Sequence, residues 1–320
     1  MEKDNVKEKF IITKVYGAYY EIGNFHEIKR ATLKGKLRLE EYNERHPFVV
    51  GDYVDAECCN GDWVIQKRHK RKNHLIRKSN PVDTHVLCAN VDRVAIIASL
   101  KNPETKDGFI DRSIAAVHHS GTTPLILFSK KDLVDENEIS LKINKYRSLG
   151  YEVLPISNND PGSIQEFLDI IDGKTTYLVG NSGVGKSSFI NLATKKAVQK
   201  INEVSLTTHK GKHTTTNTTA IFLNSSTILI DSPGIKEWGI LHLSVSELLM
   251  TFPELSTKMD SCLLSNCCST EGGCEMIEEL NSDSMDVDRK KSMQSMLFSI
   301  QSDYRLRADD INKFKYKRRK

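Results

Sequence analysis

Short apolar runs alternate with polar residues and glycines along the first 70 positions of the chain. Period-two alternation with frequent turn residues is typical of short strands, and no amphipathic helical period is present in this part. The pattern therefore predicts a small β-barrel. The expected strands cover Phe10–Ile12, Tyr19–Ile22, Ile28–Leu33, Val49–Ala56 and Trp63–Ile65.

A different pattern follows from about residue 85 to residue 240, where buried-type strands alternate with helical stretches. This alternation predicts a parallel sheet with helices on both faces. The expected strands are Val91–Leu100, Pro124–Phe128, Glu152–Ile156, Thr175–Val179, Thr218–Leu223 and Thr227–Ile230. The expected helices are Phe109–Ser120, Ile139–Leu149 and Ser163–Ile171. The remainder, 241–320, is mostly polar and helical in pattern.

The length of 320 residues is too great for one ordinary hydrophobic core, so we expect two or three domains. With 38% hydrophobic and 28% charged residues, wholesale disorder is excluded. No apolar run approaches the roughly 20 residues of a membrane-spanning helix, and the charged N-terminus does not resemble a secretory signal. We therefore expect a cytoplasmic protein without a membrane partner.

The strongest motif is a phosphate-binding loop of the type G-x-x-x-x-G-K-[ST]. It follows a predicted strand and opens a predicted helix, as phosphate binding by backbone N–H groups requires. Lys186 is expected to reach the β- and γ-phosphates, and the Ser187 hydroxyl to bind Mg²⁺. The nucleotide-binding residues expected here are Gly180, Asn181, Ser182, Gly183, Val184, Gly185, Lys186, Ser187 and Ser188.

A second motif, Asp231-Ser232-Pro233-Gly234, ends the next predicted strand. Asp231 fits a carboxylate on the Mg²⁺ side of the nucleotide. Gly234 can bring its backbone N–H to a γ-phosphate because no Cβ intervenes. A motif of this type, at this spacing after a phosphate loop in the sequence, indicates a GTPase.

Base recognition is expected from Ser129-Lys130-Lys131-Asp132, which follows an apolar strand. The Lys stem would lie over the purine, and the Asp132 carboxylate would accept hydrogen bonds from the guanine edge. The first position is Ser instead of the usual Asn or Thr, so fewer bonds to the phosphate loop and a modest affinity are expected. The segment Ile156-Ser157-Asn158, after another strand, resembles the second base-contact loop, and Ser157 is its expected nucleotide-binding residue. Another base specificity remains an alternative at this point.

These base-contact segments precede the phosphate loop, whereas in ordinary GTPases they follow it. The order predicts an α/β P-loop GTPase domain that is circularly permuted. Such a sheet tolerates permutation because its site residues lie on loops at strand ends.

A permuted GTPase between a β-barrel and a cysteine cluster resembles the ribosome small-subunit-dependent GTPase A family, RsgA or YjeQ. The resemblance spans nearly the whole chain and includes the segments 50–54, 89–92, 211–216 and 252–254. It implies an N-terminal OB-type barrel over 1–72, a GTPase domain over 73–241 and a C-terminal helical, zinc-finger-like domain over 242–320. It also implies that the chain acts on GTP and GDP, as a monomer, in late maturation of the small (30S) ribosomal subunit. Subunit-stimulated hydrolysis and rRNA binding by the barrel are implied as well.

Ile235 stands where many GTPases carry a glutamine that orients water, and it cannot hydrogen-bond. The resemblance implies that His213 supplies the catalytic group, beside Lys186, and that Thr215 is a second Mg²⁺ hydroxyl. A solvent-facing loop residue is the alternative for His213. A nucleotide switch that binds RNA or ribosomes with little hydrolysis also remains open.

Four of the seven cysteines fall within thirteen residues. The family's zinc pattern has a histidine where this chain has Cys268, with one spacer residue fewer. Four thiolates can hold Zn²⁺ tetrahedrally, so we expect one zinc ion on Cys262, Cys267, Cys268 and Cys274, against a metal-free remnant.

The net charge of +4 conceals separated charges. Basic residues gather at 67–78 and in the last eight positions, whereas 271–288 is acidic. The segment 67–78 is interpreted either as a solvated linker or as a surface that contacts RNA phosphates.

Overall fold

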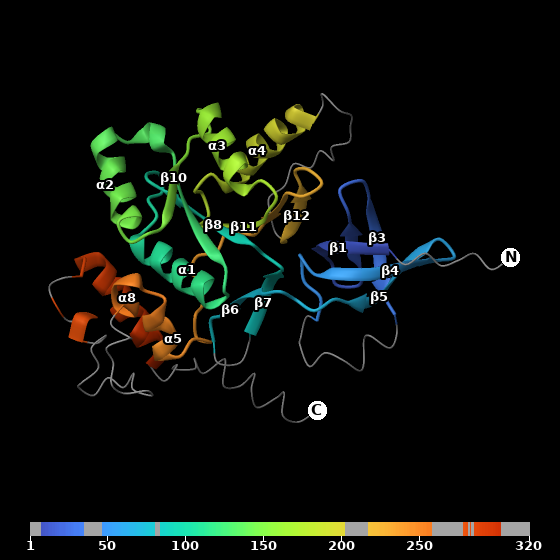
Figure 1. Ribbon diagram of the computed structural model, residues 1–320, viewed down its shortest axis with the longest axis horizontal. Coiled ribbons are helices and arrows are strands. Elements are labelled where there is room, and N and C mark those ends of the chain that lie inside the picture. The colour runs from blue at the N-terminus through green and yellow to red at the C-terminus, as the bar shows by residue number, and fades with distance from the viewer. Residues whose placement is uncertain are drawn as a thin grey trace.

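The computed structural model describes residues 8–34, 47–80, 84–201, 217–257, 278–280, 282 and 285–301, without the side chains of 198–201. A small barrel lies at one end of the molecule, an α/β unit occupies the middle, and the C-terminal helices lie on the side away from the barrel (Figure 1). The helices of these described parts include none with the length and apolar content that crossing a membrane requires.

The N-terminal part is the closed five-stranded barrel that the sequence predicts. Its strands pair in the cyclic order β1-β2-β3-β5-β4-β1, and β3 and β5 are the parallel neighbours. The core includes Phe10, Ile12, Ile22, Val54 and Ile65. The strands are β1 (Glu8–Val15), β2 (Tyr20–Gly23), β3 (Ile28–Leu33), β4 (Tyr53–Cys59) and β5 (Asp62–Arg68).

The strand predicted from Val49 begins only at Tyr53. A tight turn precedes it, in which the Asp52 carboxylate accepts a hydrogen bond from the Val49 N–H at 2.8 Å. Gly51 in this turn has φ +93°, and a Cβ there would lie 2.1 Å from the carbonyl oxygen of Ala89. Glycine is therefore required by both conformation and space.

The middle part is built on a sheet with the order β10-β9-β8-β11-β13-β12. All adjacent strands in it are parallel except β12, which runs antiparallel to β13, so the prediction of an all-parallel sheet was wrong at this edge. The same edge strand pairs with barrel strand β1 at Lys14 and Thr219. The strands are β8 (Arg93–Ser99), β9 (Thr123–Ser129), β10 (Glu152–Pro155), β11 (Thr175–Gly180), β12 (Thr219–Phe222) and β13 (Ile228–Asp231).

Helices cover both faces of this sheet, as predicted. Helices α1 (Asp107–His119) and α2 (Glu136–Arg147) pack on one face, and α3 (Pro161–Ile171) and α4 (Lys186–Ile201) pack on the other. Because the strands are parallel, their carboxyl ends share one edge of the sheet. The loops that follow β9, β10, β11 and β13 therefore meet there.

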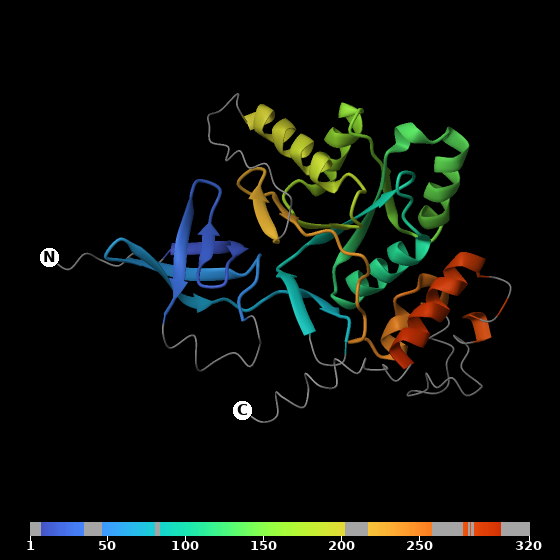
Figure 2. The same ribbon diagram turned by 180° about the vertical axis from the view of Figure 1, so that it is seen from behind.

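The C-terminal helices α5 (Val245–Met250), α6 (Pro253–Ser256) and α8 (Val287–Gln301) lie beside α1 (Figure 2). Arg289 is fully buried between them. Its guanidinium donates to both carboxylate oxygens of Glu254, at 2.8 and 2.9 Å, and to Asp111 of α1 at 2.7 Å. A charge buried in this way requires such partners, so the arginine ties the C-terminal helices to the α/β unit.

Part of the basic segment 67–78 is neither linker nor free surface. Arg71 is buried and donates two hydrogen bonds to Asp52, at 2.7 and 2.8 Å. Beyond it a hairpin, which the sequence did not reveal to us, pairs β6 (His74–Lys78) with β7 (Thr84–Ala89). Asn90, after this hairpin, donates to the Gly51 carbonyl at 2.8 Å and so joins the barrel to the α/β unit.

Candidate nucleotide-binding site

The phosphate loop connects β11 to α4, as the motif predicts. Gly183 and Gly185 have φ of +84° and +92°, a conformation that other residues rarely adopt. A Cβ on Gly180 would lie 2.7 Å from the carbonyl oxygen of Ile97 on the neighbouring strand. These three glycines therefore permit both the tight turn and its close approach to the sheet. Ser182 is exposed on this loop, and Ser187 and Ser188 are exposed in the first turn of α4.

Lys186 is buried and held by the loop that follows β13. Its ammonium donates to Oδ1 of Asp231 and to the main-chain carbonyl of Ser232. The Ser232 hydroxyl in turn donates to the Leu178 carbonyl of β11 at 2.6 Å. The structure thus brings the lysine and the carboxylate that were predicted to serve phosphate and Mg²⁺ into direct contact.

The Asp231–Gly234 turn lies against the phosphate loop. A Cβ on Gly234 would be 3.2 Å from the backbone nitrogen of Ser182. The N–H of Ile235 donates to the Gly180 carbonyl at 3.2 Å, and the Ile235 side chain is buried in the core. Its side chain therefore has neither the chemistry nor the exposure to orient a water molecule.

The first base-contact segment is joined to the phosphate loop by two side chains. The Ser129 hydroxyl donates to the Val184 carbonyl at 2.8 Å. Lys130, in the left-handed region with φ +61°, donates from Nζ to the Gly183 carbonyl at 3.0 Å. Serine thus still connects the two loops, although it offers one donor where an asparagine amide offers two.

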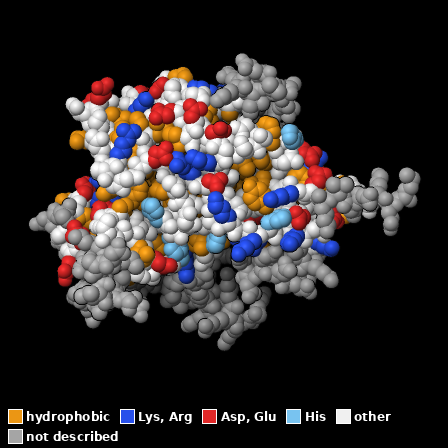
Figure 3. All heavy atoms as spheres, in the orientation of Figure 1, with side chains coloured by type: hydrophobic (Ala, Val, Ile, Leu, Met, Phe, Trp, Pro, Cys, Tyr) orange, Lys and Arg blue, Asp and Glu red, His pale blue; other side chains and the backbone are white. Residues whose placement is uncertain are grey.

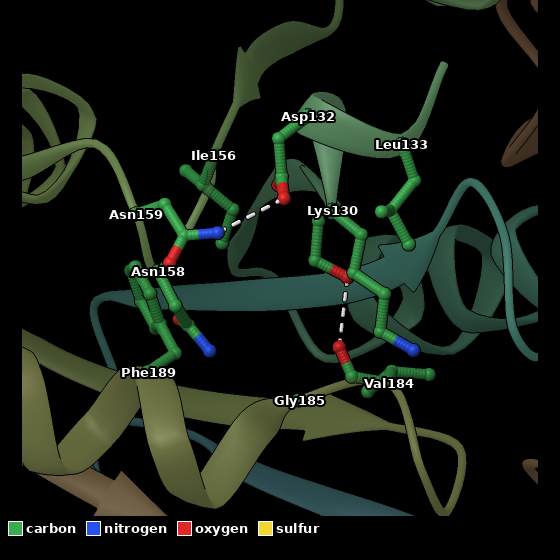
Figure 4. A pocket seen from close by; sticks show the side chains of 10 residues that line it. Lys130, Asp132, Leu133, Ile156, Asn158, Asn159, Val184, Gly185 and Phe189 are labelled. Carbon is green, nitrogen blue, oxygen red and sulfur yellow. Dashed lines mark hydrogen bonds between the residues drawn. The ribbon is translucent and has the colours of Figure 1, made fainter.

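Asp132 receives hydrogen bonds on both carboxylate oxygens from the loop after β10. The Ser157 hydroxyl donates to Oδ1 at 2.6 Å. The Asn159 amide donates to Oδ2 at 3.1 Å, as Figure 4 shows. The hydrogen bond from Ser157 is the largest cause that lowers the pKa of Asp132 below its ordinary value. The carboxylate is therefore kept charged as an acceptor.

A pocket of about 280 Å³ lies between these loops (Figure 4). Three predicted segments meet in it: the first base-contact segment, the Ser157 loop and the phosphate loop. Ile156 and Asn158 belong to the segment that the sequence indicates as the second base-contact loop. Leu133, Asn159 and Phe189 were not predicted as site residues, although Leu133 and Asn159 directly follow predicted ones. The lining residues are Ser129, Lys130, Asp132, Leu133, Ile156, Asn158, Asn159, Val184, Gly185 and Phe189.

Lys131 was predicted to bind nucleotide with its neighbours, but its ammonium is paired with Asp160 at 2.5 Å. Its backbone N–H donates to the Ile156 carbonyl at 3.2 Å. Both contacts run to the loop after β10. In this structure Lys131 thus joins the two base-contact loops.

For Mg²⁺, the described residues offer the oxygen atoms of Ser187 and Asp231, which match the preference of this hard cation. Asp231 ends β13 beside the phosphate loop, and its charge is balanced by Lys186. These residues fit Mg²⁺ that binds together with the nucleotide phosphates. His213, Thr215 and the cysteines 262, 267, 268 and 274 lie outside the described residues.

The family model described as RsgA GTPase matches residues 68–241. The "Small ribosomal subunit biogenesis GTPase RsgA" of Flavobacterium psychrophilum is 31% identical over 309 residues, which cover 92% of this chain and 94% of that protein. The chain belongs to the RsgA GTPase family. The predictions of this family and of a GTP-hydrolysing enzyme are thereby confirmed.

Two solved structures share the fold of this chain. YjeQ from Thermotoga maritima has a TM-score of 0.70 at 24% identity, with 93% of this chain and 99% of that chain covered. YloQ, described as a circularly permuted GTPase, has a TM-score of 0.67 at 22% identity, with coverages of 94% and 97%. The circularly permuted GTPase fold that the order of the motifs predicts is thereby confirmed for this chain.

Proposed function

We propose that the chain hydrolyses GTP to GDP and phosphate and takes part in biogenesis of the small ribosomal subunit, as the names of its relatives state for them. The observation that carries this proposal is the pocket in which Asp132 and the phosphate-loop residue Gly185 meet. A nucleotide whose base is held at Asp132 would extend its phosphates toward Lys186 at the start of α4. The same pocket supports GDP as the product ligand.

The chemistry of the pocket favours guanine. Guanine presents a ring N–H and an exocyclic amine side by side, and the charged Asp132 carboxylate offers two acceptor oxygens to them. Adenine lacks this pair of donors. At the other end, Lys186 would stabilise the phosphate charge, and Mg²⁺, held with help from Ser187 and Asp231, would supply a further positive charge.

The group that orients the attacking water is proposed to be His213, with Thr215 as an additional Mg²⁺ ligand. The buried Ile235 side chain supports a catalytic group from another segment. His213→Ala should keep GTP affinity within about twofold and lose subunit-stimulated turnover by about 100-fold, since positioned proton-transfer or water-orienting groups contribute 10²–10⁴-fold. Stimulated turnover at the wild-type rate would remove His213 from the mechanism.

The barrel and the hairpin β6–β7 are proposed to bind rRNA. Lys, Arg and His side chains gather along the lower part of the face in Figure 3, from β5 to the hairpin. Exposed basic residues on β5, on the hairpin and between them include Lys67, Lys70, Lys72, His74 and His85. Such a group neutralises backbone phosphates, so binding should weaken steeply as the salt concentration rises.

Aromatic side chains on the barrel offer a second kind of RNA contact. The rings of Tyr16 and Tyr19 stack with centroids 4.4 Å apart, and the Arg30 guanidinium lies 3.9 Å from the centroid of Tyr19. Unpaired bases stack on aromatic and guanidinium planes of this kind. These contacts support RNA as the ligand of the barrel.

The test of the whole proposal is the rate of GTP hydrolysis by the full chain, with and without purified 30S subunits, at low and high salt. Stimulation at low salt that fades at high salt is the expected result. Tighter binding of ATP than of GTP would instead assign another base specificity. Subunit binding without hydrolysis would assign a nucleotide switch. Gel filtration of the same sample tests the proposed monomer, and fractionation of cells tests its cytoplasmic location.

One zinc ion on Cys262, Cys267, Cys268 and Cys274 is proposed for the C-terminal domain, because four thiolates suit tetrahedral zinc. Metal analysis of protein purified without chelators should find close to one equivalent. Less than half an equivalent would contradict the site. The proposed domains end at residues 72 and 241, which limited proteolysis would test.

A further inference from the structure

The Asp132 carboxylate is held on both oxygens by side chains of one short loop, 157–159. Ser157 and Asn159 donate to different oxygens, at 2.6 and 3.1 Å. Asp132 and Asn159 are both exposed at the pocket, whereas Ser157 is buried. The orientation of the carboxylate therefore depends on hydrogen bonds and not on close packing.

Asn159 enters this arrangement twice. Its amide donates to Oδ2 of Asp132, and its backbone N–H donates to the Ser157 hydroxyl at 3.0 Å. Once that hydroxyl oxygen accepts from the backbone, its own proton is directed to Oδ1 of Asp132. The backbone part of this contact is independent of the residue type at 159, but the bond to Oδ2 depends on the amide side chain.

We propose that Asn159 is a positioning residue for guanine recognition, which holds Asp132 so that both of its oxygens face the base together. The proposal rests on the proposed function, in which this pocket receives guanine. A carboxylate oxygen accepts two hydrogen bonds, so Oδ2 keeps an acceptor position when Asn159 occupies the other. Figure 4 shows Asn159 and Asp132 on the same side of the pocket, joined by this bond.

The chemistry separates guanine from hypoxanthine. Guanine needs two acceptor oxygens in one plane, because its ring N–H and its amine donate side by side. Hypoxanthine lacks the amine and donates only from the ring N–H. Its single hydrogen bond can still form when the carboxylate is rotated. Loss of the Asn159 bond should therefore weaken GTP binding more than ITP binding.

The experiment measures the dissociation constants of GTP, ITP and ATP for the full-length wild type and for Asn159→Ala. We expect GTP to bind about fivefold more weakly to the variant, as for one lost hydrogen bond, and ITP to change less than twofold. Asn159→Gln keeps an amide donor and should retain the wild-type ratio of GTP to ITP affinity. Asn137→Ala, at an exposed asparagine on α2, is the matched control without change in any constant.

An unchanged ratio of GTP to ITP affinity in Asn159→Ala would overturn the proposal. A higher ratio would also overturn it, since the amide would then obstruct Oδ2 instead of orienting it. Both nucleotides are measured on the same sample, so a partly unfolded variant does not alter the ratio. If wild type itself prefers ATP, the proposed function fails, and that result is separate from the comparison of variants.

Discussion

The ammonium of Lys186 and the carboxylate of Asp231 form an ion pair in which the side chains are only 6% and 10% exposed. One residue begins α4 and the other ends β13, so the pair joins the phosphate loop to the loop expected on the Mg²⁺ side. A bound triphosphate would compete with Asp231 for the ammonium. The carboxylate released in this way would then be available on the metal side, and phosphate binding would be coupled to Mg²⁺ binding if Asp231 has the proposed role.

Replacement of Lys186 by alanine should therefore have two effects. It removes the charge expected to hold the phosphates, so GTP affinity should fall by about two orders of magnitude, as for the loss of charge-assisted hydrogen bonds. It also leaves Asp231 buried without this partner, which should lower the free energy of unfolding by about 3 kcal/mol. Calorimetric titration and urea denaturation measure the two quantities.

Lys195→Ala is the matched control, because Lys195 is exposed on the same helix. It should change GTP affinity less than twofold. If Lys186→Ala were as stable as wild type, the ion pair would not contribute to the stability of the fold. If it bound GTP normally, the expected role of the phosphate loop would be wrong.

Gly234→Ala should impair hydrolysis more than binding. The added Cβ would lie 3.2 Å from the backbone nitrogen of Ser182, so the phosphate loop or the Asp231–Gly234 turn must move by a few tenths of an ångström. Small displacements of reacting groups are costly, and we expect kcat to fall about tenfold or more. GDP, which lacks the γ-phosphate, should bind within about threefold of wild type.

The comparison for Gly234 is Gly17→Ala, where a Cβ meets nothing within 4 Å. Its kcat should equal that of wild type. Equal kcat for both variants, measured by phosphate release at saturating GTP, would show that contact between Gly234 and the phosphate loop is unimportant for hydrolysis.

Motifs made of consecutive residues could be predicted from the sequence, whereas contacts between residues that are distant in the chain could not. The phosphate loop is readable because a run of neighbouring backbone N–H groups and glycines performs its function. Asn159 and Phe189 enter the pocket only because the loop after β10 and the start of α4 pack beside Asp132. Asn159 directly follows the predicted base-contact segment, but nothing in the local sequence shows that its amide reaches Asp132, or that Phe189 is more than a core residue of α4.

The basic segment shows the same limit. Arg71 lies in a run of basic residues, but its partner Asp52 is 19 positions earlier in the chain. Only the folded barrel shows that this arginine is buried while Lys70 is exposed. The hairpin β6–β7 was missed as well, although Ser79, Asn80 and Pro81 between its strands form an ordinary turn signal.

Ser157→Ala should move the pH dependence of GTP binding. The hydrogen bond from Ser157 lowers the pKa of Asp132, so the carboxylate stays charged to a lower pH than an ordinary aspartate. Binding that needs the charged form is present above this pKa and is lost as the pH falls through it. Without the hydroxyl the pKa rises toward its ordinary value, so the acid limit of binding should shift to higher pH.

Titrations of GTP affinity from neutral pH down to about pH 3 measure this shift, because an ordinary aspartate titrates at about pH 4 and the pKa of Asp132 lies below that. The thermal unfolding temperature of each variant at each pH serves as the control for acid unfolding. An acid limit that coincides with that of wild type would show that Asp132 does not govern base binding in this range.

Two neighbouring residues of the basic segment should have different roles: Arg71 should stabilise the fold, and Lys70 should bind RNA. Arg71→Ala leaves the fully buried Asp52 without this partner and should cost about 3–5 kcal/mol of unfolding free energy. Lys70→Ala removes an exposed charge and should leave stability within about 0.5 kcal/mol. It should instead weaken binding to 30S subunits, and the slope of log affinity against log salt should fall by about one. Urea denaturation measures the stability of both variants, and a salt series of subunit binding measures their affinity.

Equal loss of stability in the two variants, or an unchanged salt slope for Lys70→Ala, would contradict this division of roles.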